Sequence, residues 1–117
     1  MTKYQYMTYD QYMSPADFKI EKMNRNESRK LVRKIMTLMP QNVLFSKHAL
    51  AELENDDLTT TDALNILKSS DSKIIDDGEF EHGSYRYRLE TGNIVVVICF
   101  SSNGEHLIVV TAWDKRK

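Results

Sequence analysis

The last third of the chain alternates apolar runs with turn residues. Residues 94–100 and 107–113 are rich in β-branched side chains, and they follow Gly92 and Gly104. Runs of this length and composition are typical of buried strands rather than helices. Gly104 follows an asparagine, a pair that supplies the positive φ of a tight hairpin. Together with the preceding segment from Tyr85, these two apolar runs predict three antiparallel strands joined as a meander.

Helical periodicity precedes these strands. Between Asn26 and about Met39 the apolar residues fall on one face of a helix that Asn26 would cap and Pro40 would end. Ser46 is a typical N-cap for a second helix, and the threonines at 59–61 are typical N-caps for a third. These helices all lie before the meander in the chain.

Shorter extended stretches complete the pattern. Residues 43–45 are apolar and extended, Lys73 begins a further strand, and residues 79–81 continue toward Tyr85 after a turn at Gly78. The sequence therefore predicts an α+β fold, with N-terminal helices packed on one face of an antiparallel sheet of about four strands.

The N-terminal segment has a different composition. Residues 1–13 contain four tyrosines at a spacing that fits neither helix nor strand, which indicates an arm packed on the body or on a partner. Ser14 and Pro15 are typical of a short helix start, ending near Met23. We expect a single domain, with this arm and helix in residues 1–25 and the core in residues 26–117.

Charge and cysteine content limit the function classes. The net charge is −1 and the pI is about 6.3, so any site for an anion must be local. The single cysteine, Cys99, lies in the most apolar strand and is expected to be a buried, inert thiol. The polar N-terminus is unlike a secretory signal, and no apolar run reaches membrane-span length. We therefore expect a cytoplasmic protein without a membrane segment.

A basic stripe runs along the first predicted helix. Arg25, Arg29 and Arg33 follow one another at four-residue steps and would share one face. The stripe is either a solvated face or one wall of a phosphate groove.

The arginines of the Tyr85 strand are the main candidates for chemistry. Arg86 and Arg88 are two residues apart and so share one face, whereas Tyr85 and Tyr87 share the other, where we expect packing. The arginines would hold a phosphate, or form cross-strand ion pairs with Glu90 or Glu105. The histidines at 48, 82 and 106 lack metal-ligand spacing, and we expect neither metal nor cofactor. The remaining chemistry is metal-free acid–base catalysis on a phosphodiester, with the 2′-hydroxyl of RNA as nucleophile.

Residues 85–92 resemble a segment of the MqsR toxins, Tyr-Arg-Pro-Arg-Leu-Val-Thr-Gly, and read Tyr-Arg-Tyr-Arg-Leu-Glu-Thr-Gly here. Residues 31–34, 43–50 and 62–67 follow the same order of elements, and residues 70–73 match a Ser-Asp segment followed by a lysine. Residues 45–49 are also similar to the start of small RelE-superfamily domains. The resemblance covers roughly residues 27 to 117.

The resemblance implies a RelE-like fold and a ribosome-independent mRNA interferase that a cognate antitoxin neutralises. Lys73 corresponds to a catalytic lysine, and Arg86 and Arg88 correspond to an arginine pair. Two positions depart from the family: His82 lies near a family glutamine, and Val95 takes the place of a tyrosine.

Together these observations predict a ribonuclease site. The expected catalytic residues are Lys73, His82, Arg86 and Arg88. The expected RNA contacts are Arg29, Arg33, Trp113, which could stack a base or be buried, and Lys115, loosely matching a C-terminal lysine of the family. His48 and Tyr87 are further candidates, with a capping or core histidine as the alternative for His48.

Three functions follow from this prediction. The first is a toxin that cleaves mRNA and arrests growth. The second is a binding module of the same fold without catalysis, such as a phage or mobile-element inhibitor of another protein, with the tyrosine-rich arm as contact surface. The third is an inhibitor that acts only on the ribosome.

Overall fold

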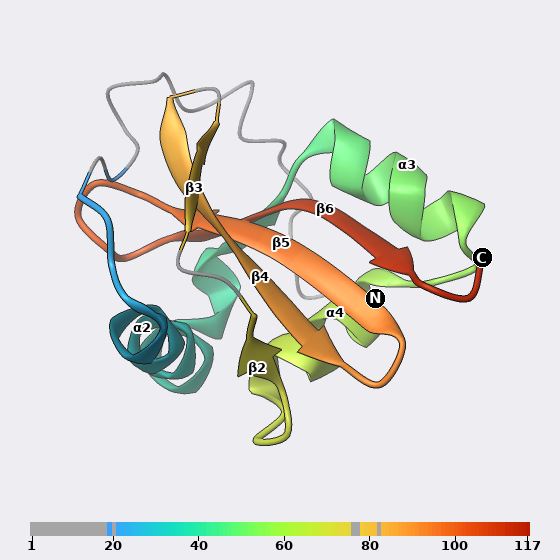
Figure 1. Ribbon diagram of the computed structural model, residues 1–117, viewed down its shortest axis with the longest axis horizontal. Coiled ribbons are helices and arrows are strands. Elements are labelled where there is room, and N and C mark those ends of the chain that lie inside the picture. Colours follow the sequence, from blue (N-terminus) through green and yellow to red (C-terminus); the bar gives the residue numbers. More distant parts are fainter. Residues whose placement is uncertain (1–18, 20, 76–77, 82) are drawn as a thin grey trace.

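The computed structural model describes residues 19, 21–75, 78–81 and 83–117 (Figure 1). The described residues contain three α-helices and one 3-10 helix: α2 (Arg25–Leu38), η2 (Pro40–Asn42), α3 (Lys47–Asn55) and α4 (Thr60–Lys68). The strands of this part of the chain are β1 (Val43–Phe45), β2 (Lys73–Ile74), β3 (Glu79–Glu81), β4 (Ser84–Thr91), β5 (Ile94–Phe100) and β6 (Leu107–Asp114).

The strands form one mixed sheet in the order β1-β6-β5-β4-β2, with β3 paired to β4. The predicted meander is confirmed, because β4, β5 and β6 pair antiparallel in sequence. The prediction of about four antiparallel strands is wrong: the described residues alone contribute six strands to the sheet, and β1 pairs parallel to β6. The helices are not all N-terminal to the sheet, since α3 and α4 follow β1 and provide the long connection that a parallel pair requires.

Side chains at the helix starts explain where the helices begin. The predicted caps Ser46 and Thr59 are confirmed, since the hydroxyl of each accepts a hydrogen bond from the third backbone N–H that follows it. The predicted cap of α2 at Asn26 is wrong. Asn24 caps this helix, and Glu27 completes a capping box by accepting from the Asn24 N–H at 3.0 Å.

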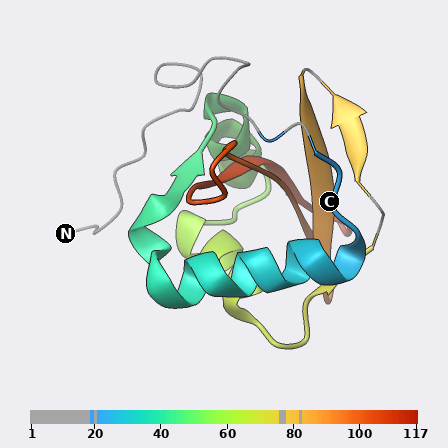
Figure 2. The same cartoon turned by 90° about the vertical axis from the view of Figure 1, so that its left-hand side faces the viewer.

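The two faces of the sheet have different surroundings. One face packs against α2, α3 and α4 in the main core, to which β4 contributes Tyr87 and Leu89 and β5 contributes its even-numbered residues. Figures 1 and 2 show α2 and α4 lying together beside this face, while α3 lies beside β6. The other face holds a smaller apolar cluster that includes Val97 and Cys99. Because strand side chains alternate, Arg86 and Arg88 belong to this second face.

Two short strands pair with opposite ends of β4. β2 pairs with its C-terminal end, placing Lys73 opposite Glu90, and β3 pairs with its N-terminal end, placing Glu79 opposite Arg86 (Figure 1). The turn before β3 contains Gly78 at φ +90°, where an added Cβ would lie 2.7 Å from the Tyr87 ring. The two ends of β4 therefore present different neighbours to any ligand.

Several predictions fall outside the described residues. They concern the tyrosine-rich segment 1–13, most of the predicted helix from Ser14, and His82. The end of that predicted helix is described, and residues 21–24 are not helical. Within the described ranges, no helix has both the length and the apolar character needed to cross a membrane.

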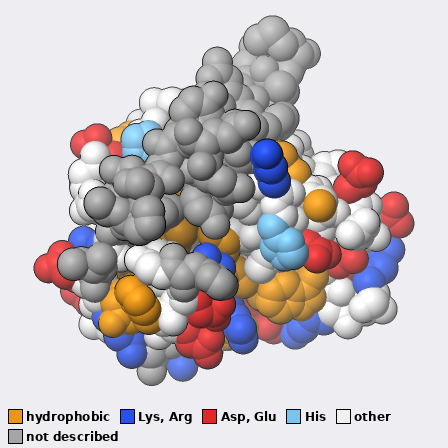
Figure 3. All heavy atoms as spheres, turned by 90° about the horizontal axis from the view of Figure 1, so that it is seen from above, with side chains coloured by type: hydrophobic (Ala, Val, Ile, Leu, Met, Phe, Trp, Pro, Cys, Tyr) orange, Lys and Arg blue, Asp and Glu red, His pale blue; other side chains and the backbone are white. Residues whose placement is uncertain are grey.

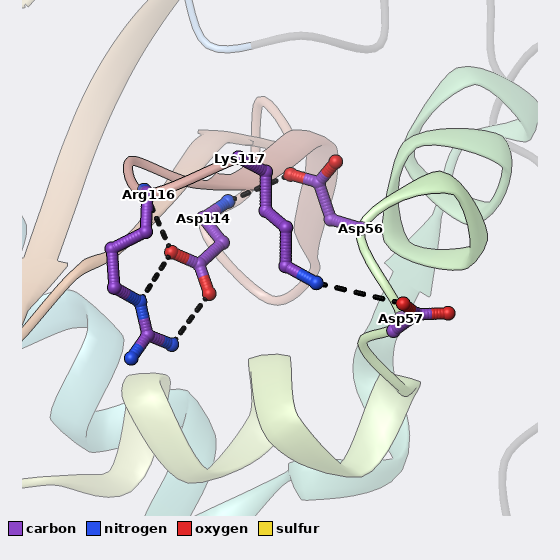
Figure 4. Close-up of polar contacts among 5 residues, drawn as sticks. All are labelled: Asp56, Asp57, Asp114, Arg116 and Lys117. Carbon is purple, nitrogen blue, oxygen red and sulfur yellow. Dashed lines mark hydrogen bonds and ion pairs between the residues drawn. The ribbon is translucent and has the colours of Figure 1, made fainter.

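A polar network attaches the C-terminus to the turn between α3 and α4 (Figure 4). Asp114 is 3% exposed, and its carboxylate accepts three hydrogen bonds from Arg116: from the backbone N–H, from Nε, and from Nη2 at 2.7 Å. The Asp114 N–H donates to the Asp56 carboxylate at 2.8 Å, and Lys117 lies 3.5 Å from Asp57. Residues at the end of β6 thereby hold a turn that lies almost sixty positions earlier in the chain.

This network predicts that the free energy of unfolding depends on pH within a narrow acidic range. Hydrogen bonds from Arg116, first its side chain and then its backbone, lower the pKa of Asp114 to about 2. Because the pKa is lower in the folded state, this carboxylate stabilises the fold fully above its unfolded pKa of about 3.9, and the contribution is lost as the pH falls toward 2. Urea unfolding of Asp114→Asn should lack this acid-sensitive component.

The matched control is Asp57→Asn, which removes an exposed ion pair and keeps a residue type that tolerates the positive φ of 59° at this position. It should retain the wild-type loss of stability between about pH 4 and pH 2. An Asp114→Asn variant with the wild-type pH profile would contradict the assignment.

Candidate functional site: two clusters of cations on β4 and α2

The arginines of β4 line a pocket of about 100 Å³ on the sheet face opposite the helices. The alternation predicted from sequence is what places them there, since Tyr87 between them is 1% exposed and lies in the core. Seven of the described residues line the pocket: Glu79, Glu81, Arg86, Arg88, Val97, Thr111 and Trp113. We call it the β4 pocket. It combines two guanidinium groups, two carboxyl groups and an indole.

Arg86 reaches into the sheet surface. Its Nε is buried and has no hydrogen-bond partner in the described part of the chain. Its charge also acts on Cys99, although burial is the dominant influence and raises the pKa of the thiol to about 11, with a hydrogen bond involving Ser84 and then Arg86 opposing the rise. Cys99 is therefore a neutral thiol at physiological pH, as its apolar strand predicted.

The carboxylates of the β4 pocket were not among the predicted site residues. Glu79 and Glu81 are exposed on β3, and the register of β3 with β4 sets Glu79 directly opposite Arg86. The two glutamates are separated by one residue, the same spacing as the arginines. That shared period of two was the available signal, since two paired strands with this spacing bring both pairs to one face.

Glu90 and Glu105 were the predicted ion-pair partners of the arginines, and neither lines the β4 pocket. The Glu90 carboxylate accepts a hydrogen bond from Lys115 Nζ at 2.8 Å, and Glu105 is exposed in the loop before β6. Lys115, predicted to contact RNA, is thus ion-paired at the far end of β4 rather than in the pocket. Trp113 does line the pocket and is only partly buried.

Lys73 is placed in a different cluster from Arg86 and Arg88. A groove of about 350 Å³ between α2 and β2 is lined by Lys73 together with Arg29 and Arg33, two of the predicted RNA contacts. We call it the α2–β2 groove. The described residues that line it also include Arg25, Asn26, Ser72 and Ile74. The predicted site is therefore divided into an arginine–glutamate pocket and a basic groove that share no lining residue.

The remaining candidates have other surroundings. His48 is exposed on α3, where its Nε2 lies 3.7 Å from Glu52 one turn later. Tyr87 is buried in the core, and its hydroxyl accepts a hydrogen bond from the Met23 N–H at 2.9 Å. Neither lines the β4 pocket or the α2–β2 groove. The placement of His82 lies outside the described residues.

Comparison of the chain with protein-family models, with curated proteins and with solved structures gave no match, so the resemblance to the MqsR toxins remains a prediction from the sequence.

Proposed function

We propose that this protein is a metal-independent endoribonuclease that cleaves mRNA and arrests growth as the toxin of a toxin–antitoxin system in the cytoplasm. The observation that carries the proposal is the β4 pocket, where Arg86 and Arg88 face the same space as Glu79 and Glu81. The toxin role and the antitoxin partner rest on the sequence resemblance of residues 85–92.

The pocket contains groups suited to RNA transesterification. A carboxylate of Glu79 or Glu81 would take the proton from the 2′-hydroxyl, whose oxygen then attacks the adjacent phosphorus. Arg86 and Arg88 would bind the non-bridging oxygens, where negative charge increases in the transition state. The bond to the 5′ oxygen breaks, that oxygen takes a proton from water, and a 2′,3′-cyclic phosphate remains. Trp113 would stack on a neighbouring base.

This mechanism differs from the one that the resemblance implies. Lys73 lines the α2–β2 groove and not the β4 pocket, so we assign proton transfer to the glutamates of β3.

The glutamates can be tested directly. Glu79→Gln and Glu81→Gln keep the size of each side chain and remove its ability to accept a proton. If one of them is the base, the corresponding variant should cleave RNA about 10²–10⁴-fold more slowly. The exposed Glu54 on α3 provides the control, and Glu54→Gln should retain the wild-type rate. Wild-type rates in both β3 variants would contradict the assignment.

The charge balance of the pocket favours a second candidate, the non-catalytic binding module. Two arginines and two glutamates line the same small volume, so the attraction for RNA is weaker there than in a purely basic pocket. On the face that Figure 3 shows, acidic and basic side chains likewise lie next to one another around exposed hydrophobic groups. Phe80 is 56% exposed on β3 and points to the opposite side of this strand from the two glutamates, where its ring packs on that of Tyr85; this exposed aromatic side chain would suit a protein partner.

Expression in bacteria separates these functions. The ribonuclease should arrest growth with loss of mRNA, and the purified protein should cleave free RNA in the presence of a chelator. Harmless expression at high level would instead support the binding module. Growth arrest with free RNA left intact would support an inhibitor that acts only on the ribosome.

A further inference from the structure

All charged side chains among the described residues that line the α2–β2 groove are positive. Among the described residues that form it, Arg25, Arg29, Arg33 and Lys73 are cationic and none is acidic. The nearest acidic group by strand register, Glu90 opposite Lys73, has its carboxylate bonded to Lys115. The described lining residues therefore contribute four cations and no carboxylate to the groove.

Arg29 is held in the groove in a way that leaves part of it unsatisfied. Its Nη2 donates to the carbonyl of Ser69, which follows α4, and this bond fixes the guanidinium against the body. Its Nη1 is buried without a hydrogen-bond partner in the described part of the chain. Burial, and then the charge of Arg33, lower the pKa of this guanidinium. An orphaned donor beside a like charge is unfavourable unless a ligand supplies an acceptor.

The spacing of the cations suits an extended ligand. Arg25, Arg29 and Arg33 follow one another at four-residue steps, which correspond to a rise of about 6 Å per step along the helix. Like charges at this spacing repel one another and destabilise an isolated helix, and these three arginines form two such pairs. A chain that presents a negative charge at regular intervals would turn this repulsion into attraction.

We propose that the α2–β2 groove binds the phosphate backbone of single-stranded RNA as a site separate from the β4 pocket. The choice of RNA rests on the proposed ribonuclease function, whereas the polyanion site rests on the groove itself. An acidic peptide is the competing ligand. Peptide grooves obtain affinity from apolar anchors, but Ile74 is the single apolar side chain among the described lining residues and is 7% exposed. Arginine forks in a polar groove suit phosphate oxygens instead.

The binding test uses fluorescence anisotropy with a labelled 2′-O-methyl oligoribonucleotide, which lacks the 2′-hydroxyl and cannot be cleaved by transesterification. Arg33→Ala and Lys73→Ala are the groove variants, because both side chains are exposed and their loss should leave the fold intact. Lys30→Ala and Lys34→Ala are the matched controls. They lie on α2, are exposed, change the charge equally, and line a different surface together with Glu27.

Each groove variant should weaken binding about tenfold, and the controls should weaken it by less than about twofold. For single-stranded nucleic acid, the loss of one phosphate contact should also reduce the slope of log K against log salt by about 0.7. Equal weakening in the groove and control variants would overturn the proposal. So would groove variants that reduce the binding of an acidic peptide and leave the binding of the oligonucleotide unchanged.

The two proposals can fail separately. If the wild-type protein leaves ordinary RNA intact but binds the 2′-O-methyl strand through Arg33 and Lys73, the groove assignment stands and the ribonuclease is refuted. If both groove variants bind RNA with the wild-type affinity and cleave it at the wild-type rate, the ribonuclease stands and the groove assignment is overturned.

Discussion

Arg86→Ala should lower the rate of RNA cleavage about 10²–10³-fold, the effect of removing one preorganised donor to an oxyanion. Arg86 extends from β4 into the β4 pocket, and its Nε is buried without a partner in the described part of the chain. The cleavage rate of the purified variant under single-turnover conditions gives the measurement.

Arg86→Lys is the sharper variant, because it keeps the charge and removes the planar fork. If the pair of guanidinium groups binds phosphate oxygens bidentately, lysine should restore only part of the rate. Lys34→Ala, an exposed change of charge on α2, should cleave at the wild-type rate. Full activity in Arg86→Ala, with the melting temperature unchanged, would rule out a catalytic β4 pocket.

Tyr87→Ala should reduce the free energy of unfolding by about 3–5 kcal/mol, the range for removing a large buried aromatic side chain. Tyr87 is 1% exposed, its ring centroid lies 5.8 Å from that of Phe100, and the Gly78 turn packs against it. It is next to Arg86 in sequence, but it points to the opposite face of the sheet. Urea unfolding measures the effect.

Tyr87→Phe separates the hydroxyl from the ring. The Met23 N–H donates to this hydroxyl, and its loss would leave a buried donor without an acceptor, at a cost of about 1–3 kcal/mol. Cleavage by folded Tyr87→Phe should equal that of the wild type, since Tyr87 does not line the β4 pocket. A stable variant with reduced cleavage would show instead that the hydroxyl acts in the reaction.

The meander and the helix starts could be predicted because their signals are local. The glycines before β5 and β6 both have positive φ, and the strands alternate as the sequence indicated. The signal for the start of α2 is also local, since Asn24 and Glu27 form a capping box and Asn26 lies inside the helix. Asn24 and Asn26, two residues apart, offer similar caps, and the bond that the Asn24 N–H donates to Glu27 decides between them.

The parallel pairing of β1 could not be read from the chain. Residues 43–45 showed an apolar extended stretch, but their partners on β6 lie more than sixty positions later. Strand order depends on how α3 and α4 pack, and the hydrophobic periodicity of a short segment does not contain that information. The prediction of about four antiparallel strands missed the mixed character of the sheet for this reason.

The site was predicted in its residue types better than in its arrangement. The common face of Arg86 and Arg88 followed from the strand period, but the register that brings Glu79 opposite Arg86 depends on the turn between β3 and β4. Lys73 was grouped with these arginines through the sequence resemblance. In the structure β2 pairs with the other end of β4, so Lys73 joins the cations of α2.

The most direct measurement is cleavage of a synthetic RNA by the purified protein in excess chelator, beside the same RNA with a single 2′-deoxy nucleotide at the cleaved position. A ribonuclease that uses the substrate's own hydroxyl should cut the first and leave a 2′,3′-cyclic phosphate, and it should leave the second intact at that position. Cleavage of both strands, or of neither, would contradict the assignment of the β4 pocket as a transesterification site.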